Sequence, residues 1–390
     1  MRIGINASFA RKQNTGIGQV TINLLKKLAT RCDTYDTRCK NFEFYVYFEE
    51  ETDLKLPAGF KKRVFLPFWK RDDLIRKILW EKFSLPWKVK EDKCDVFISL
   101  YQSATVLSGD IKHIMVVHDV IPKLLPEYLN NSRKKIYQKL IEKGVREADK
   151  IIAVSHRTEK DIIQNLSVPP SKITVSYIDV DEIYKNEISE NENMRVLAKY
   201  NLSPGYIYNG GGLEVRKNVE GLVRAYKLLL EKNKKEQIIN NFPKLVISGK
   251  LMPQLAPLVT DVEKLLKELN LTQHVELLDF VPQKDLPAIY RNALMFAYPS
   301  FYEGFGLPVL EAMSQGTPVI ASKKSSLPEV GGDSVLYCDP SDEEDIAMVM
   351  KNVLVNKDLR KVLSQKGKNR ADNFSWERFV EKILNIAESL

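Results

Sequence analysis

The chain has 390 residues, of which 44% are hydrophobic and 28% are charged. These proportions exclude a disordered, collagen-like or low-complexity protein, and the length fits two domains of fewer than about 200 residues each. The sequence contains neither the apolar run of a membrane span nor that of a signal peptide, which favours a cytoplasmic protein. The cysteines are too few and too scattered for a disulfide framework or a zinc site, so we expect free thiols; they are Cys32, Cys39, Cys94 and Cys338.

The net charge of +8 is unevenly distributed. The first 180 residues hold 32 Lys and Arg against 22 Asp and Glu, whereas the remainder is slightly acidic. Much of the surplus lies in residues 60–90, together with three of the four tryptophans: Trp69, Trp80 and Trp87. This segment is compatible with two arrangements. Either it contacts an anionic membrane surface, or Trp80 and Trp87 pack in the core while the Lys and Arg side chains form a solvated face.

In chain order, an apolar strand at 2–7 is followed by a glycine-containing loop and a helix at 19–28. Further strand-like runs lie at 96–100, 114–117, 151–154 and 173–177, separated by segments of helical periodicity such as 133–146. Strands that are apolar on both faces and alternate with helices predict a parallel sheet covered on both sides.

The polar, acidic segment 181–203 is expected to be a linker between a first domain at 1–180 and a second at 204–372. Strands in the second domain are expected at 206–208, 245–248, 275–280, 294–298 and 319–321, and helices at 218–230, 261–269, 285–293 and 307–315. The pattern of the last segment, 373–390, predicts a helix. This helix could pack on the second domain or cross back to the first. Open parallel sheets bind ligands at the carboxyl ends of their strands, so two facing sheets predict a site between them.

The most informative stretch joins the strand ending at Tyr298 to the helix at 307–315. Its loop contains Glu303, and the glycines beside it would let a ligand approach the backbone amides at the helix start. These amides belong to Gly304, Phe305, Gly306 and Leu307. Glu311 lies one to two turns into the helix. The local pattern alone predicts a phosphate-binding site and an ordinary glycine loop with two glutamates equally well.

Glu303 and Glu311, separated by seven residues, resemble the E-x7-E signature of retaining glycosyltransferases of family GT4, which have the GT-B fold. Other segments resemble the same family in order, at 14–25, 115–122, 150–162, 211–226, 279–293 and 327–342. Within the family, TGIG and LEVRKN resemble the mannosyltransferase-like branch most. The resemblance implies two facing Rossmann-like domains, an acceptor domain followed by a nucleotide-sugar domain.

The resemblance also implies roles for single residues. Glu303 would bind the transferred sugar and Glu311 the ribose, while residues 304–307 offer amides to sugar and phosphate. Arg216 and Lys217 follow a glycine-rich turn and would neutralise the diphosphate leaving group. The alternative for this pair is a solvated helix start capped by Asn218. Val281 would lie near the base.

In the first domain, Gly16 and Gly18 resemble the family's glycine loop near the donor phosphates or the acceptor, and His118 resembles its sugar-binding histidine. A lone histidine at a strand end is more often only hydrogen-bonded, but the surrounding HDVIP favours the functional interpretation. The resemblance also implies that the reaction proceeds with retention on one face of the sugar and that the leaving phosphate helps to deprotonate the acceptor. Glu303 would then be a positioning and electrostatic residue. The resemblance implies no metal and no other cofactor.

We therefore expect a hexosyltransferase that uses a nucleotide-diphosphate sugar, GDP-mannose being favoured, and a hydroxyl of a glycan, glycolipid or lipid-linked acceptor in polysaccharide or cell-envelope biosynthesis. Two alternatives stay open, a nucleotide-sugar epimerase and a catalytically idle nucleotide-sugar-binding subunit. The expected location is cytoplasmic, with peripheral contact between 60–90 and an anionic inner membrane as one arrangement. Nucleic acid is not an expected partner, because the charge surplus is local and no RNA- or DNA-binding module is present.

Overall fold

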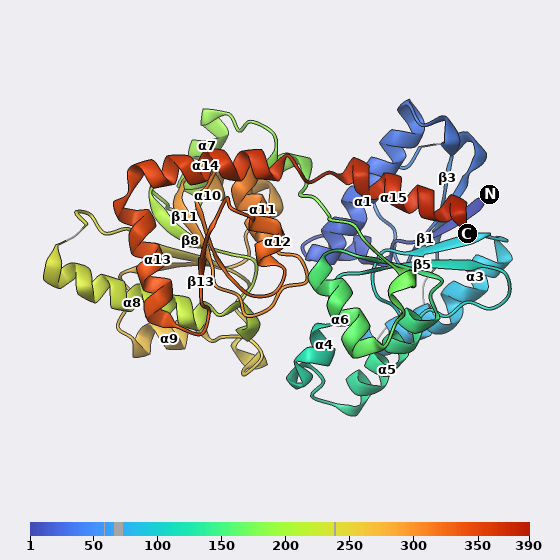
Figure 1. Cartoon of the computed structure of the whole chain (residues 1–390), viewed down its shortest axis with the longest axis horizontal. Helices are drawn as coiled ribbons and strands as arrows, with labels where there is room; N and C mark the ends of the chain where they lie inside the picture. Colours follow the sequence, from blue (N-terminus) through green and yellow to red (C-terminus); the bar gives the residue numbers. More distant parts are fainter. Residues whose placement is uncertain (58, 66–72, 238) are drawn as a thin grey trace. The chain divides into compact units, whose positions relative to one another are not determined.

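A computed structural model describes residues 1–57, 59–65, 73–237 and 239–390. The chain divides into two compact units, the first made of Met1–Ile178 and Ser375–Leu390 and the second of Asp179–Phe374. Each unit contains one sheet with helices around it (Figure 1). None of the helices in the described ranges is both long enough and apolar enough to cross a membrane.

The sheet of the first unit has seven parallel strands in the order β3-β2-β1-β4-β5-β6-β7. The strands are β1 (Arg2–Asn6), β2 (Glu43–Phe48), β3 (Phe60–Val64), β4 (Val96–Ser99), β5 (Lys112–Val117), β6 (Lys150–Ala153) and β7 (Ile173–Val175). The α-helices are α1 (Gly16–Thr34), α2 (Asp73–Leu79), α3 (Leu85–Glu91), α4 (Ile121–Leu124), α5 (Ser132–Glu147), α6 (His156–Leu166) and α15 (Trp376–Ser389). The reversal of strand order at β1 and β4 makes this a doubly wound sheet, as the alternating pattern predicts.

The second unit has six parallel strands in the order β10-β9-β8-β11-β12-β13. The strands are β8 (Tyr206–Asn209), β9 (Leu245–Ser248), β10 (Val275–Leu278), β11 (Ala293–Tyr298), β12 (Val319–Ser322) and β13 (Leu336–Cys338). The α-helices are α7 (Glu190–Lys199), α8 (Val219–Glu236), α9 (Val262–Glu268), α10 (Leu286–Arg291), α11 (Leu307–Ser314), α12 (Leu327–Gly331), α13 (Glu343–Val355) and α14 (Lys357–Ala371). Helix α8 packs against α9 and α13, while α11 packs against α10, α12 and α14.

The segment 181–203, which its composition predicts to be a linker, is instead part of the second unit. Ser189 caps helix α7, whose Val196 and Leu197 are buried. The helix contacts α10, and Lys199 Nζ lies 2.5 Å from a carboxylate oxygen of the fully buried Asp285. The acidic residues that suggest a linker lie at the surface of this helix, so composition alone conceals its packed face.

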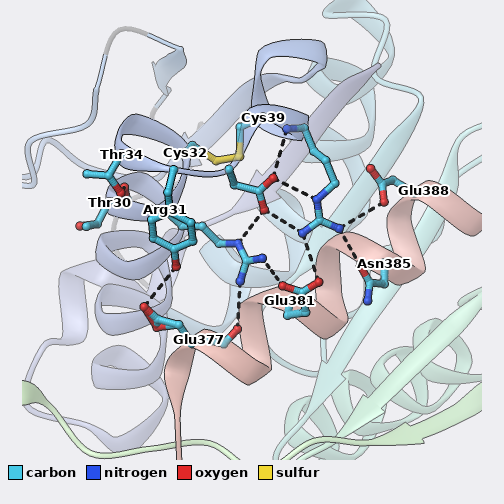
Figure 2. A network of polar contacts seen from close by, with 12 residues as sticks. Thr30, Arg31, Cys32, Thr34, Cys39, Glu377, Glu381, Asn385 and Glu388 are labelled. Carbon is cyan, nitrogen blue, oxygen red and sulfur yellow. Dashed lines mark hydrogen bonds and ion pairs between the residues drawn. A yellow bond between two sulfur atoms is a disulfide. The ribbon is translucent and has the colours of Figure 1, made fainter.

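Helix α15 belongs to the first unit, although it follows the second in sequence. It contacts α1, and the two helices lie side by side in Figure 1. Asp36 joins Arg31 and Arg38 through hydrogen bonds of 2.7 Å each, and both arginines also bind Glu381 of α15. Figure 2 shows this network and the adjoining disulfide. The last helix therefore docks through partly buried charge pairs as well as apolar contacts.

The expectation of free thiols is wrong for Cys32 and Cys39, which form a disulfide with their Cα atoms 5.2 Å apart. Helix α1 ends at Thr34, and the 3-10 helix Thr37–Asn41 reverses the chain, which brings Cys39 back to the last turn of α1. Spacing alone does not reveal such a reversal. For Cys94 and Cys338 the expectation is confirmed, since both are free and buried.

We expect reduction of this disulfide to lower the free energy of unfolding of the first unit by about 2 kcal/mol, because the bond closes a short loop in the unfolded chain. The loop carries Asp36 and Arg38, so hydrogen exchange in α15 should rise as well. Urea unfolding and exchange with and without a thiol reductant measure both effects. The double variant Cys32→Ser, Cys39→Ser should match the reduced wild type and should not respond to the reductant.

In the basic segment 60–90, the expected packing in the core is confirmed for Trp80 and wrong for Trp87. Trp80 is completely buried and stacks on Phe65 with ring centroids 4.0 Å apart, whereas Trp87 is 61% exposed. Trp69 lies outside the described residues, as do Lys70, Arg71 and Asp72. Burial of Trp80 fixes the segment that follows α2 against the sheet.

A buried carboxylate, Glu81, accompanies Trp80 in the π-helix Trp80–Ser84. It accepts hydrogen bonds from the hydroxyls of Tyr101 and Tyr137 and from the backbone N–H of Ala104, at 2.8 to 2.9 Å. Lys77 Nζ lies 3.7 Å from it. The Glu81 side chain thus links the π-helix to the segment after β4 and to helix α5 in the first unit.

Candidate functional site

The loop between β11 and α11 is shaped by Gly306, which precedes the first residue of the helix. Gly306 has a φ of 109°, and a Cβ atom there would lie 2.5 Å from Cδ2 of Leu327. Only glycine meets both conditions without strain. Leu307 and Pro308 then begin α11, as the sequence predicts.

Two serines of the segment after β12 form hydrogen bonds with the backbone of the same loop. The backbone N–H of Glu303 donates to Ser325 Oγ at 3.0 Å. Ser326 Oγ lies 2.9 Å from the carbonyl oxygen of Glu303 and 2.8 Å from that of Phe305. The Phe305 side chain is buried against Phe374, and Gly304 is buried between its neighbours. The loop backbone is therefore fixed before any ligand arrives.

The Glu303 carboxylate lies at the centre of a buried polar cluster. Oε2 pairs with Nη1 of Arg216 at 2.9 Å. Oε1 accepts hydrogen bonds from the Tyr298 hydroxyl at 2.7 Å and from Ser300 Oγ at 3.1 Å. Lys217 Nζ lies 3.5 Å from the same oxygen. The structure thus brings together Glu303, Arg216 and Lys217, which the sequence predicts to share one site.

This environment sets the charge of Glu303. Burial acts to raise its pKa, but the positive charges of Arg216 and Lys217 outweigh burial and lower the pKa to about 2. The carboxylate is therefore ionised throughout the neutral range. Its oxygens accept from two hydroxyls and face two cations, which suits fixed electrostatics better than nucleophilic attack.

Arg216 and Lys217 lie in the 3-10 helix Val215–Lys217, directly before α8. Asn218 caps α8 by accepting from the backbone N–H of Gly221, so this part of the alternative interpretation is confirmed. The cations are not a solvated helix start, however, since Lys217 is only 6% exposed. The carbonyl oxygen of Arg216 also accepts from the Phe301 N–H at 2.7 Å, which joins this turn to the Glu303 loop.

Glu311, on the second turn of α11, is buried in a different environment. Its Oε2 accepts a hydrogen bond from the Tyr290 hydroxyl at 2.9 Å. Burial raises its pKa to about 7 despite that hydrogen bond. The two glutamates of the motif therefore differ in protonation, because Glu303 is ionised throughout the neutral range whereas Glu311 titrates near neutrality.

The raised pKa of Glu311 predicts a pH dependence of stability. Between its unfolded pKa of 4.5 and its folded pKa of about 7, the native state binds a proton that the unfolded state has lost. Stability of the second unit should thus fall as pH rises through this window, by up to about 1.4 kcal/mol per pH unit from this group. Hydrogen exchange of β11 and α11, corrected for intrinsic rates, measures it. Glu311→Gln should remove this slope; an unchanged slope in the variant would contradict the assignment.

Tyr298 and Ser300 were not among the residues that the sequence singles out, although both bind Glu303 directly. A detectable signal for Tyr298 is its position as the last residue of a buried parallel strand, where a hydroxyl needs a polar partner. Ser300 offers no comparable signal. Val281 lies on the loop after β10 with its side chain buried, while the preceding Phe280 is 45% exposed.

In the first unit, Gly18 lies in the first turn of α1, where its N–H donates to the capping Thr15 side chain at 3.1 Å. A Cβ atom on Gly18 would lie 2.0 Å from the carbonyl oxygen of Lys12, so this glycine allows close packing of two backbone segments. A Cβ atom on Gly16 would meet no neighbour within 4 Å. Of the two, Gly16 is the one with open space at the helix start.

His118 follows β5 and is buried. Its Nε2 lies 2.8 Å from the carbonyl oxygen of Leu100, so Nε2 carries the proton and donates. Burial lowers the pKa of His118, and the ring is neutral at physiological pH, with Nδ1 as an acceptor. Within the described ranges, no group of three or more His, Cys, Asp and Glu side chains is arranged to hold a metal ion.

Two family models match the chain. The model described as Glycosyltransferase Family 4 matches residues 14–181, and the model described as Glycosyl transferases group 1 matches residues 191–370. The first covers the Gly16, Gly18 and His118 segments, and the second covers Arg216, Lys217 and both glutamates.

Named relatives were found at 30% identity. The O-antigen chain mannosyltransferase B of Escherichia coli matches over 96% of this chain and 96% of its own length. The serotype-specific mannosyltransferase WbdA of Escherichia coli matches 68% of this chain, which corresponds to 32% of its own length. Among solved structures, WaaG, a glycosyltransferase involved in lipopolysaccharide biosynthesis, superposes with a TM-score of 0.74 over 99% of both chains, at 16% identity. This likeness confirms the predicted fold class.

Proposed function

Because the chain belongs to family 4 of the glycosyltransferases and is itself a glycosyltransferase, we propose that it transfers mannose from GDP-mannose, with retention, to a hydroxyl of a glycan or lipid-linked acceptor. The mannosyl assignment is supported by the relative that matches nearly the whole chain, which is named an O-antigen chain mannosyltransferase. By the same likeness, the reaction would serve polysaccharide or cell-envelope biosynthesis. The observation that carries the proposal is the buried cluster of Glu303, Arg216 and Lys217.

In this proposal, Arg216 and Lys217 bind the donor diphosphate and stabilise the charge that develops as it leaves. Backbone amides of residues 304–307 would contribute to the same task at the start of α11. Glu303 would accept hydrogen bonds from hydroxyls of the transferred sugar, and Glu311 would accept from the ribose. The low pKa of Glu303 supports this role, because a carboxylate that stays ionised can accept at any physiological pH.

The first unit would contribute His118 and the glycine turn before α1. Because Nε2 of His118 donates to Leu100, the neutral ring offers Nδ1 as an acceptor for a sugar hydroxyl. Gly16 has space for a ligand to approach, whereas Gly18 is occupied by packing against Lys12. Val281 would lie near the base in the second unit.

We expect transfer to require no metal ion, because the leaving diphosphate has Arg216 and Lys217 to neutralise it. Treatment with excess EDTA followed by gel filtration should leave kcat/KM within about twofold of the untreated enzyme. Loss of activity on EDTA treatment and its recovery with Mn²⁺ would contradict this prediction.

The decisive experiment is a thermal-shift panel of GDP, UDP, dTDP and ADP, followed by a transfer assay with the matching sugar nucleotides. A nucleotide at 100 times its dissociation constant stabilises the folded state by about 2.7 kcal/mol. A shift with GDP and transfer of mannose to an acceptor are the expected results. A shift with a nucleotide other than GDP would identify a different donor. Conversion of the donor into an epimerised nucleotide sugar would favour an epimerase, and binding without turnover would favour an idle subunit.

Contact of residues 60–90 with an anionic membrane stays a prediction. Phe83 and Trp87, which are 57% and 61% exposed, are the apolar side chains available for it in the described part of the segment. Flotation with vesicles of anionic and of neutral lipid would test it.

A further inference from the structure

The amino group of Lys217 and the carboxylate of Glu303 are separated by a neutral hydroxyl. Lys217 Nζ donates to the hydroxyl oxygen of Tyr298 at 2.9 Å, and that hydroxyl donates to Glu303 Oε1 at 2.7 Å. The direct distance between Nζ and Oε1 is 3.5 Å, longer than a good charge-assisted hydrogen bond. Tyr298 therefore bridges the two groups, whose direct ion pair is long.

The bridge affects what else the ammonium group can bind. A lysine ammonium has three N–H donors, and a short, hydrogen-bonded ion pair with a buried carboxylate would hold it against that carboxylate. Here a neutral oxygen takes one donor, while Arg216 already pairs with the other carboxylate oxygen at 2.9 Å. The positive charge of Lys217 is thus only partly neutralised and keeps donors for an anion.

The position of the hydroxyl is fixed by the core. The Tyr298 ring is fully buried and stacks on Phe296, with centroids 5.5 Å apart. Phe296 in turn contacts the rings of Tyr208 and Tyr290. Burial raises the pKa of Tyr298, so its hydroxyl keeps its proton and can donate to Glu303 at neutral pH.

We propose that Tyr298 is a positioning residue that holds the Lys217 ammonium away from Glu303 and so keeps it available to the terminal phosphate of a nucleoside diphosphate. This inference rests on the proposed function, since it assumes that Lys217 faces the donor diphosphate. Without the hydroxyl, the Lys217 ammonium would move closer to the Glu303 carboxylate and would no longer contact the terminal phosphate. The packing of the ring at position 298 would remain.

The test is the variant Tyr298→Phe, which removes one oxygen atom and keeps the ring. Calorimetric titration with GDP and GMP, or with the diphosphate and monophosphate of whichever nucleotide the panel selects, separates the two phosphates. We expect the variant to lose about tenfold in affinity for the diphosphate, because one hydrogen bond to a charged group contributes about that much. For the monophosphate we expect a loss of less than about twofold. A general disturbance of the site would weaken both ligands alike.

Two further variants sharpen the test. Tyr226→Phe is the matched control, because Tyr226 is also a buried tyrosine of the second unit, but its hydroxyl donates to the backbone oxygens of Pro243 and His274. It should leave both affinities unchanged. In a Lys217→Met background, Tyr298→Phe should cause no further loss for the diphosphate, since the effect passes through Lys217.

The results distinguish the inference from the function on which it rests. Equal losses for both nucleotides, additive effects of Tyr298→Phe and Lys217→Met, or unchanged diphosphate binding in Tyr298→Phe would each overturn the inference while the wild type still binds its nucleotide. If the wild type binds none of the four nucleoside diphosphates, the proposed function fails, and the inference fails with it.

Discussion

Replacing Glu303 with glutamine is expected to lower kcat/KM for sugar transfer by about a hundredfold or more. The amide keeps the shape of the side chain but removes its charge and turns one oxygen into a donor. That donor would face Arg216, or else the hydroxyls of Tyr298 and Ser300, all of which now donate to the carboxylate. The variant would leave the charges of Arg216 and Lys217 without their common partner and would disturb the fixed geometry of the loop.

The measurement is the initial rate of transfer at several donor concentrations, with the thermal unfolding midpoint recorded for each variant. Glu276→Gln is the matched control, because Glu276 is a carboxylate of the same unit, on β10, that is 36% exposed and pairs with Lys244 at the surface. The control should lose less than about twofold. A Glu303→Gln enzyme that retains near-wild-type kcat/KM would refute the central role of this carboxylate.

Replacing Glu81 with alanine is expected to lower the free energy of unfolding of the first unit by about 3 to 5 kcal/mol. Glu81 is completely buried, and its carboxylate satisfies the hydroxyls of Tyr101 and Tyr137 and the N–H of Ala104. Alanine would leave all three donors buried without their acceptor and would remove a carboxylate that faces the Lys77 ammonium. Each orphaned buried donor costs about 1 to 3 kcal/mol.

Tryptophan fluorescence suits this measurement, because all four tryptophans fall within the sequence ranges of the first unit. Urea titrations of wild type and Glu81→Ala would give the difference in unfolding free energy. Glu91→Ala provides the comparison, since Glu91 is 49% exposed and pairs with Lys88 at the surface. We expect a change within about 0.5 kcal/mol for Glu91→Ala. A Glu81→Ala difference equally small would show that the cluster is not a structural anchor.

Most strands of both sheets could be predicted from the sequence, but β2 and β3 of the first unit were missed. Strand β3 carries Lys61, Lys62 and Arg63, so its sequence resembles a charged surface segment. It is an edge strand, paired on one side with β2, and an edge position tolerates charged side chains that a central position would not. The position of a strand in the sheet, which decides this tolerance, is not encoded in its local pattern. The short edge strand β13 was missed in the other sheet.

The residues from Glu303 to Glu311 lie within a single loop and helix, so one continuous motif that resembles family GT4 singles them out. Residues that reach the same loop from elsewhere in the chain could not be predicted in this way. Ser325 and Ser326 reach the Glu303 loop from beyond β12, and no local pattern marks them as its support. The roles of the predicted donor-site residues stay predictions until ligands are tested.

The division of the chain gives the two units a different order of completion during synthesis. The second unit is one continuous segment, 179–374, whereas the first also needs residues 375–390. A ribosome therefore delivers every residue of the second unit before it delivers helix α15, and domains generally fold as their residues emerge. Until then Arg31 and Arg38 lack Glu381, and buried residues of α15 such as Phe379 and Ile383 are missing from the core. The first unit therefore starts to be synthesised before the second but can complete its fold only after the second.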